Sequence, residues 1–223
     1  MGFSKEWNEI YINNQQLSIW PWDEVIALTH RNFKQKDGMV VLELGCGAGA
    51  NIPFFASIGA KYYAIEGSAH IVKRLQNSFK SDKIHITCGD FTKDFGFEEI
   101  IGRVDLIIDR SAVTHNSTKS IKSVVKLANQ YLKPGGKYMA FDWFATDCDT
   151  YKNDEKIKID DNTFVFNSGY FAGLGNVHFS TPEHIKELFA KFSLDYLINN
   201  VKEQLQPEPK RSSSYTFIAT KPL

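Results

Sequence analysis

Short apolar runs alternate with amphipathic stretches through the middle of the chain. Runs rich in aliphatic and β-branched residues are typical of strands buried on both faces of a parallel sheet, and they predict strands at residues 39–44, 61–65, 84–87, 104–108 and 137–141. Between them, Ile71, Leu75 and Phe79 recur at four-residue spacing, which predicts a helix. Residues 121–132 carry a wider apolar stripe and predict a second one. Repeated β-α units with right-handed crossovers form a doubly wound sheet, so the fold class is α/β.

The C-terminal third has a different rhythm. Thr181 and Pro182 are typical of the N-cap and the first position of a helix, which is predicted to continue to about residue 192. Residues 194–204 and 214–220 predict two strands joined by a polar loop. Because no helix separates them, these strands are expected to pair antiparallel at the end of the sheet.

The N-terminal segment is rich in aromatic residues. It is predicted to form helices that pack across the top of the sheet, with Trp20-Pro21-Trp22 as a stiff turn between them. We therefore expect a helical cap over residues 1–38 and the main domain over residues 39–223. A chain of 223 residues is long enough for one α/β domain with a well-buried core, so both parts are expected to form one compact unit.

Composition narrows the choice of partner and compartment. Lysine plus arginine and aspartate plus glutamate both number 26, and a net charge of zero gives no global electrostatic reason to favour DNA, RNA or an anionic membrane. No apolar run approaches the ~20 residues needed to cross a bilayer, and the N-terminus shows no signal-peptide pattern. Cys46, Cys88 and Cys148 lack metal-type spacing and are expected to be free thiols in a reducing cytoplasm.

A glycine turn follows the first predicted strand directly. The sequence of residues 40–49 is VVLELGCGAG, a buried strand that breaks into alternating glycines. Such a turn lets backbone N–H groups approach a ligand closely, and open α/β sheets build nucleotide-like cofactor sites in this way. Gly45, Gly47 and Ala50 also fit the dinucleotide fingerprint G-x-G-x-x-G/A. Glu43 weighs against that reading, because a carboxylate at this place would repel a pyrophosphate.

The pattern Glu43-x-Gly45-x-Gly47-x-Gly49 resembles motif I of the class I S-adenosylmethionine-dependent methyltransferases. The resemblance implies S-adenosyl-L-methionine as cofactor and a Rossmann-like sheet of seven strands, mixed because the last strand is antiparallel. In the family, the acidic residue stabilises the positively charged amino-acid moiety of the cofactor. The positions of the turn that the resemblance assigns to cofactor binding are Glu43, Gly45, Cys46, Gly47 and Gly49.

Two further strand ends fit the same cofactor. Glu66-Gly67 ends the second strand, where an acidic side chain can accept hydrogen bonds from a ribose diol, a feature shared with NAD proteins. Asp90-Phe91 follows the third strand. In the family, this acidic residue accepts a hydrogen bond from the adenine amino group, and Phe91 offers an apolar surface to the ring. Alone, Gly-Asp is common in turns. The assignment of both pairs to cofactor binding depends on their order along the chain after motif I.

The end of the fourth strand is expected at the reaction centre. The resemblance places Asp109 and Arg110 beside the methyl donor, with residues 111–115 lining the same centre. The segment reads Asp-Arg-Ser-Ala-Val-Thr-His, without the Asn/Asp-Pro-Pro-Tyr/Phe pattern of enzymes that methylate amino groups of nucleic acids. Asp109 and His115 are candidate catalytic residues, His115 as a general base because imidazole titrates near neutral pH. The alternative is a helix-start histidine that only packs against the cofactor.

Two later segments supply further candidates. Asp142 and Trp143 close the fifth strand, where they are expected to orient the acceptor and to form a wall, with a capping aspartate and a core tryptophan as the alternative. Residues 169–180 are rich in glycine and aromatic residues, which is typical of a loop that folds over a pocket. This loop supplies His178 as a second base candidate, against the alternative of a packed histidine.

Aromatic rings near the expected pocket are candidates for contact with the substrate. Ring faces favour a cationic sulfonium or amine, and the rings in question belong to Trp20, Trp22, Trp143 and Tyr170. Side chains of this kind also serve simply as core or lid.

These motifs together predict a methyltransferase that transfers a methyl group to an O or N atom of a small molecule, such as a sugar or another secondary metabolite. Nucleic acid, membrane and metal are not expected as partners, and a homodimer is left open. One alternative is a NAD-dependent oxidoreductase on a Rossmann domain, which Glu43, the terminal hairpin and the lack of a Tyr-x-x-x-Lys pair oppose. The other is a protein that binds S-adenosylmethionine without catalysing transfer.

Overall fold

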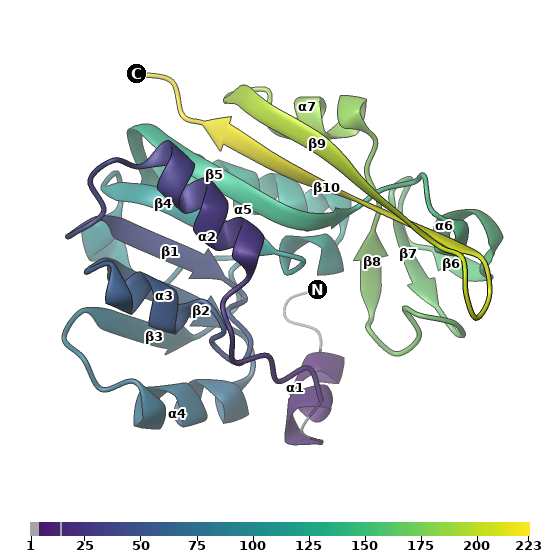
Figure 1. Cartoon of the computed structure of the whole chain (residues 1–223), viewed down its shortest axis with the longest axis horizontal. Helices are drawn as coiled ribbons and strands as arrows, with labels where there is room; N and C mark the ends of the chain where they lie inside the picture. Colours follow the sequence, from purple (N-terminus) through teal and green to yellow (C-terminus); the bar gives the residue numbers. More distant parts are fainter. Residues whose placement is uncertain (1–4, 14) are drawn as a thin grey trace.

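The computed structural model describes residues 5–13 and 15–223, and its centre is a seven-stranded sheet of order β3-β2-β1-β4-β5-β10-β9 (Figure 1). In chain order its strands are β1 (Val40–Leu44), β2 (Lys61–Glu66), β3 (Ile84–Cys88), β4 (Val104–Arg110), β5 (Leu132–Phe144), β9 (Ser193–Gln204) and β10 (Lys210–Thr220). Strands β1 to β5 pair in parallel, whereas β10 is antiparallel to both β5 and β9. The predicted mixed, doubly wound sheet is confirmed.

Helices cover both faces of the sheet. The helices α2 (Asp23–Asn32), α3 (Ile52–Ser57) and α4 (Ala69–Ser78) pack on one face, and α5 (Thr118–Tyr131) and α7 (Pro182–Leu188) on the other. The sheet has one hydrophobic core on each face, because successive side chains of a strand point to opposite faces. Val41 of β1 packs under the first group of helices and Leu42 under the second. As predicted, Thr181 caps α7 by accepting a hydrogen bond from the His184 N–H at 3.2 Å. None of the helices in the described ranges is long and apolar enough to cross a membrane.

The N-terminal helices lie in different places. Helix α2 lies across the face of the sheet, whereas α1 (Lys5–Ile12) stands beside the start of α4 at the end of the sheet where the parallel strands finish (Figure 1). Asn8 of α1 fixes this position, because its Oδ1 accepts a hydrogen bond from the Ser68 hydroxyl at 2.7 Å. Of the two helices described in the segment predicted as a cap, α1 therefore lies at the carboxyl end of the parallel strands and α2 lies on a face of the sheet.

A small lobe that the sequence pattern does not predict is inserted between β5 and α7. It contains α6 (Asp149–Asn153) and an antiparallel sheet of β6 (Lys156–Lys158), β7 (Thr163–Phe166) and β8 (Asn176–His178). Its own apolar cluster includes Phe164, Phe166, Phe171 and Phe179. The predicted loop over residues 169–180 is partly strand β8, and the three-residue strands are too short to give a periodic signal.

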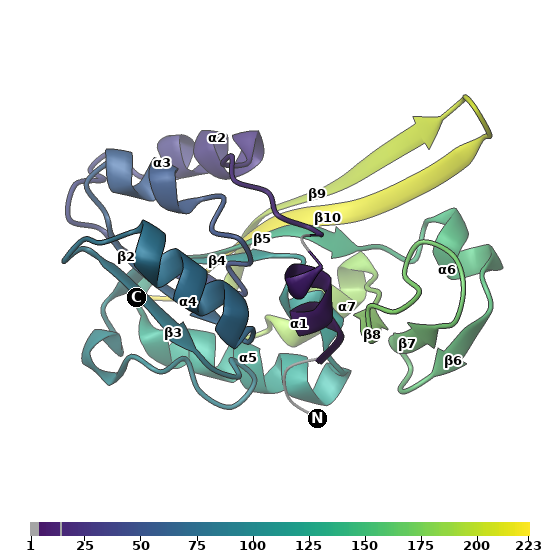
Figure 2. The ribbon, with the colours of Figure 1, turned by 90° about the horizontal axis from the view of Figure 1, so that it is seen from below.

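The last two strands extend beyond the rest of the sheet. Strand β10 pairs with β5 only from Ser214 onward, whereas Lys210 to Ser213 pair with β9 alone. The hairpin therefore continues as a two-stranded ribbon that projects over the inserted lobe, as Figure 2 shows.

Candidate active site

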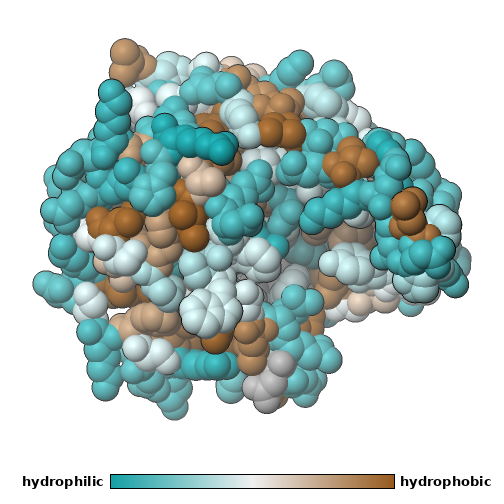
Figure 3. Space-filling view, in the orientation of Figure 1, coloured by the Kyte–Doolittle hydropathy of each residue, from teal (hydrophilic) through white to brown (hydrophobic). Residues whose placement is uncertain are grey.

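A cavity of about 970 Å³ opens at the carboxyl ends of the parallel strands. The glycine turn and the end of β4 form its floor, α1 and Trp22 flank it, and the inserted lobe and the hairpin complete the far side. The space-filling view shows the molecule hollowed between the main body and this lobe (Figure 3). Parallel α/β sheets bind their ligands at this end of the strands.

The glycine turn has a backbone that other residues would strain. Gly45 and Gly47 have φ angles of +64° and +50°, and both line the cavity together with Cys46. A Cβ atom on Gly45 would lie 2.5 Å from the Cβ atom of Ala112, so glycine is required for packing as well as for conformation. Gly49 does not line the cavity: a Cβ atom there would lie 2.7 Å from Leu75, which makes it a packing residue between β1 and α4.

Glu43 reaches the cavity from the end of β1 and is almost fully buried. Its carboxylate accepts hydrogen bonds from the Tyr62 hydroxyl at 2.6 Å and from the Asn51 amide at 3.0 Å. Burial raises the pKa of Glu43 to about 7, and the two hydrogen bonds and the charge of Arg110 oppose that rise. A buried carboxylate with an elevated pKa is stabilised in its charged form by a cation, so the site fits the amino group of an amino acid.

Glu66 and Asp90 both line the cavity. The Glu66 carboxylate accepts hydrogen bonds from the N–H groups of Gly47 at 3.0 Å and Ser68 at 2.9 Å, which ties the end of β2 to the glycine turn. The backbone of Gly67 also hydrogen-bonds to this carboxylate. Because a carboxylate offers about four acceptor positions, Glu66 keeps some capacity to accept from a hydroxyl of a ligand. Asp90 accepts hydrogen bonds from Thr92 at 3.0 and 2.7 Å, and Phe91 beside it lines the same part of the cavity.

The ends of β4 and β5 hold an arginine in a fixed position. The Arg110 guanidinium lies 3.4 Å from the centroid of the Trp22 ring and 2.8 Å from the Asp142 carboxylate, and all three side chains line the cavity. Ser111 and Asp142 have positive φ angles of +53° and +51°, and the Ser111 hydroxyl donates to the Asp142 carbonyl at 3.1 Å. Such backbone geometry in residues other than glycine is strained and clusters at functional sites.

His115 is the histidine that lines the described part of the cavity. Its Nδ1 lies 3.1 Å from the carbonyl oxygen of Asn176 in β8, and since a carbonyl can only accept, Nδ1 carries the proton. Nε2 then holds the lone pair and has no hydrogen-bond partner among the described residues. The rings of Trp7 and Phe144 contact the imidazole edge to face, and burial lowers the pKa of His115 to about 4. At neutral pH, His115 is therefore an uncharged acceptor.

Two predicted site residues lie in the core instead. Asp109 and Trp143 are fully buried and do not line the cavity. The Asp109 carboxylate accepts hydrogen bonds from the Trp143 indole at 2.6 Å, the Tyr138 hydroxyl at 3.1 Å, and the N–H groups of Ala112 and Val113 at 3.1 and 3.0 Å. The alternative of a core tryptophan was therefore right. Asp109 fixes the turn that leads to His115, and it cannot touch a ligand.

His178 and Trp20 also lie away from the cavity wall. His178 is fully buried between Thr163 and His184, with its two ring nitrogens 3.0 Å from the Thr163 hydroxyl and 3.1 Å from His184 Nε2. Burial, with the neighbouring His184, lowers the pKa of His178 to about 3. Trp20 is 77% exposed and does not line the cavity, whereas Tyr170, also exposed, lies at the cavity edge. The predicted roles of His178 and Trp20 are corrected accordingly.

Both low-pKa imidazoles give a testable pH dependence. Because the histidines of the unfolded chain bind protons near pH 6.5, whereas His115 and His178 do so only near pH 4 and 3, their contribution to stability is complete above pH 6.5 and is lost as the pH falls. We expect NMR titration of the native imidazoles to show these two neutral at pH 5. Midpoints near 6.5 would contradict the buried positions.

Sequence reasoning missed several residues that line the cavity. Trp7 and Tyr11 of α1, and Phe144 and Phe171 near the lobe, all face it. The aromatic content of the N-terminal segment was the available signal for the first two residues. Phe171 lies in the glycine- and aromatic-rich segment predicted to fold over a pocket, whereas no local signal pointed to Phe144, because its position depends on how the lobe folds back.

Comparisons with known proteins agree with this geometry. Residues 41–136 match the family model of a methyltransferase domain. Protein arginine N-methyltransferase 6 of Danio rerio is 32% identical over 113 residues, which are 48% of this chain and 31% of that protein, so the chain spans under a third of this curated relative. An S-adenosylmethionine-dependent methyltransferase from Methanosarcina mazei superposes with a TM-score of 0.70 at 17% identity, covering 88% of this chain and 97% of its own.

A second solved structure carries ligands. The 1,6-didemethyltoxoflavin-N1-methyltransferase of Burkholderia thailandensis, with bound 1,6-didemethyltoxoflavin and S-adenosylhomocysteine, superposes with a TM-score of 0.62 at 14% identity over 90% of this chain and 78% of its own. The fold and the cavity thus define a Rossmann-like cofactor-binding domain. Residues 41–136 are similar in sequence to a methyltransferase domain, and the chain has the fold of S-adenosylmethionine-dependent methyltransferases, whose cofactor is S-adenosyl-L-methionine.

Proposed function

We propose that this chain transfers a methyl group from S-adenosylmethionine to an O or N atom of a small molecule held in the cavity. The observation that carries the proposal is the position of His115, which lines the same cavity as the glycine turn and whose Nε2 has no hydrogen-bond partner among the described residues. Ligand pockets have volumes of about 300–1,000 Å³, so a cavity of about 970 Å³ has room for the cofactor and a small acceptor together.

The cofactor fits the floor of the cavity. Glu43 would face its ammonium group, Glu66 would accept a hydrogen bond from the ribose hydroxyls, and Phe91 would lie against the adenine. The turn at Gly45 and Gly47, whose positive φ angles favour glycine, would lie against the cofactor. When bound, the cofactor supplies an already activated methyl group on a sulfonium.

The residues of the chain then have limited but specific tasks. Methyl transfer from a sulfonium needs the acceptor atom in line with the methyl carbon and sulfur, and it needs water kept out. Trp7 and Phe144 hold the imidazole and supply apolar walls. His115 Nε2 accepts a hydrogen bond from the acceptor and takes its proton as the new bond forms. Alignment of the substrate in the cavity and proton acceptance by His115 are the two contributions proposed for the chain, and neither needs a further charged group.

The expected setting of the enzyme is the cytoplasm, with a small-molecule acceptor and no nucleic-acid or membrane partner. The three free cysteines support a reducing compartment. An arginine acceptor, as named for the Danio rerio relative, has less support, since the far side of the cavity carries lysines without carboxylate partners among the described residues.

A labelling experiment tests the proposed function. The protein is incubated with methyl-labelled S-adenosylmethionine and a cell extract, and label is followed in the small-molecule, protein and nucleic-acid fractions. We expect label in a small molecule and release of S-adenosylhomocysteine. Label confined to protein or nucleic acid would contradict the small-molecule acceptor, and binding of the cofactor without any labelled product would favour the non-catalytic alternative.

Replacement of His115 tests its role as base. General acid–base groups typically contribute about 10²–10⁴-fold to rate, so we expect His115→Ala to lower kcat by a factor in that range and to leave the affinity for S-adenosylhomocysteine unchanged. His70→Ala is the matched control, because His70 is exposed on α4. An unchanged kcat would show that His115 only packs, which is the alternative interpretation.

A further inference from the structure

The overhanging part of the hairpin turns one polar face toward the cavity. Alternate residues of a strand point to the same side. Asn200, Lys202 and Gln204 of β9 and Lys210, Ser212 and Ser214 of β10 share one side and all line the cavity, which Glu203 and Ser213 of the other side also border. The residues of the shared side are direct cross-strand partners, since Asn200 pairs with Ser214, Lys202 with Ser212 and Gln204 with Lys210. This face, which we call the hairpin face, carries two positive charges and no carboxylate.

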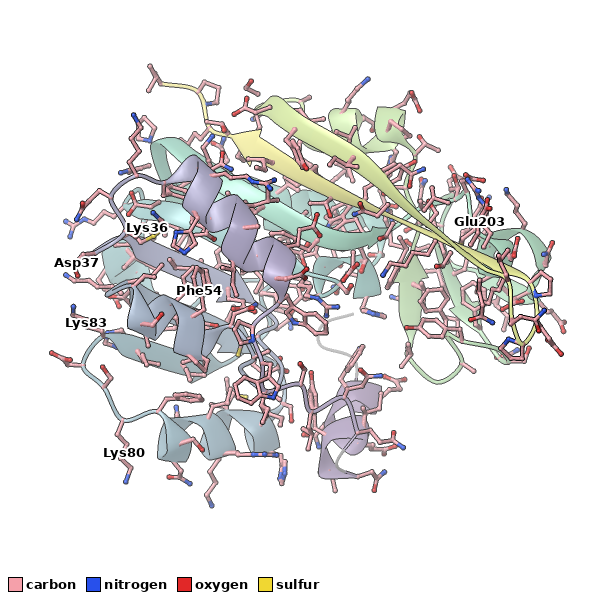
Figure 4. All side chains as sticks on the ribbon, viewed as in Figure 1. Lys36, Asp37, Phe54, Lys80, Lys83 and Glu203 are labelled. Carbon is pink, nitrogen blue, oxygen red and sulfur yellow. The ribbon has the colours of Figure 1, made fainter. Side chains whose placement is uncertain are left out.

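The other charges on this side of the cavity are already paired. Asp142 lies 2.8 Å from Arg110, and Glu203, whose place on the hairpin Figure 4 marks, lies 2.6 Å from Arg211. In contrast, neither Lys202 nor Lys210 lies within 4.0 Å of a carboxylate in the described part of the chain.

The two lysines differ in their surroundings. Lys202 acts on Glu24 only through its longer-range charge. The Lys210 ammonium lies 5.5 Å from the centroid of the Tyr170 ring. Lys210 also borders a second, smaller pocket, which Asp154 and Glu208 line as well. Lys202 borders the large cavity without lining this second pocket.

Another part of the cavity wall is apolar. Phe144, Phe171 and Phe179 line this part of the cavity, with ring centroids 4.8 Å apart for the first pair and 5.6 Å for the second pair. His115 also lines the cavity, and the centroid of its ring lies 5.6 Å from that of Phe144. Apolar walls with a few placed polar groups are typical of small-molecule sites, because the walls bind the body and the polar groups fix its orientation.

We propose that the methyl acceptor carries a carboxylate or phosphate group, held by Lys202 with Lys210, on an apolar or aromatic body that packs against Phe144 and Phe171. The inference rests on the proposed function and specifies the substrate class of the same site. Like charges repel, so a cationic acceptor such as a guanidinium is disfavoured.

Matched probe molecules test the proposal in the intact protein saturated with S-adenosylhomocysteine. The probes are 2-aminobenzoate and its neutral amide, 2-aminobenzamide, titrated by their own fluorescence, and phenyl phosphate, titrated by displacement. We expect the acid to bind more tightly than the amide by about tenfold, which corresponds to about 1.4 kcal/mol, and the preference to weaken as salt screens the lysines. The comparison of phenyl phosphate with 2-aminobenzoate identifies which anion the site prefers.

Variants assign the preference to the hairpin face. Lys202→Met is expected to weaken binding of the acid about tenfold while leaving the amide unchanged. Lys80→Met is the control, because Lys80 lies at the opposite end of the molecule (Figure 4). Equal affinities for acid and amide, an unchanged Lys202→Met variant, or no binding of any anion while S-adenosylhomocysteine binds would each overturn this inference. Failure to bind S-adenosylhomocysteine would overturn the proposed function instead.

Discussion

Replacement of Gly47 by arginine is expected to abolish binding of S-adenosylhomocysteine and to leave the fold intact. Gly47 lines the cavity with a φ of +50°, and a Cβ atom there would lie 3.0 Å from the Tyr11 hydroxyl, so the new side chain would occupy the space of the ligand. The backbone strain costs about 1–2 kcal/mol, which is small beside a typical folding stability of about 5–15 kcal/mol. Calorimetric titration and a thermal melt measure the two effects.

Gly102→Arg is the matched control for this variant. Gly102 has a similar positive φ of +71°, yet nothing lies within 4 Å of a Cβ atom built there, and the residue is remote from the cavity. The control should lose a comparable amount of stability and keep its full affinity. If Gly47→Arg also kept its affinity, the ligand would bind elsewhere.

Replacement of Asp109 by alanine is expected to cause the largest loss of stability. The fully buried carboxylate serves four donors, among them the indole of Trp143 and the N–H of Val113. Each buried donor left without a partner costs about 1–3 kcal/mol, and relief of the buried charge offsets part of that. We expect a net loss of roughly 3–5 kcal/mol in the free energy of unfolding measured with denaturant.

The raised pKa of Asp109 makes the predicted loss of stability depend on pH. Burial raises the pKa of Asp109 from 3.8 to about 6, so its contribution to stability is greatest below pH 3.8 and is lost as the pH rises through 6. The destabilisation by Asp109→Ala should therefore be larger at pH 5 than at pH 8.

Asp37→Ala provides the surface comparison. Its carboxylate is exposed, 3.8 Å from Lys83 (Figure 4), and such pairs contribute about 0–1 kcal/mol.

A variant of Asp109 that kept full stability but lost turnover would restore the catalytic role first expected for this residue. Loss of both, with cofactor affinity following the folded fraction, is the result that the structure predicts.

The parts of the fold that were predictable have local signals. Strands β1, β2 and β4 consist mostly of apolar residues because both of their faces are largely buried, so their apolar runs located them within a few residues. The edge strand β3 was located by its β-branched residues although it is only partly buried. The glycine turn was equally visible, since a positive φ at Gly45 and Gly47 selects glycine. Strand β5 starts earlier than predicted because Leu132 pairs with Val104, a long-range contact.

The parts that were not predictable depend on contacts between distant segments. Asp109 at a strand end has the sequence context of a site residue, and only the packing of Trp143 over it shows that the carboxylate is enclosed. His115 and His178 were similar candidates in the sequence, yet only His115 faces the cavity. The lobe to which His178 belongs is built from strands of three or four residues, which are too short to show a periodic pattern.

Calorimetric titration of the wild-type protein with S-adenosylhomocysteine, and separately with NAD, tests the central claim most directly. Glu43, Glu66 and the glycine turn line one cavity with a cation-compatible carboxylate at its floor. The account predicts saturable binding of S-adenosylhomocysteine at one site and no heat from NAD. Binding of NAD without S-adenosylhomocysteine would contradict it, because the turn would then serve a pyrophosphate.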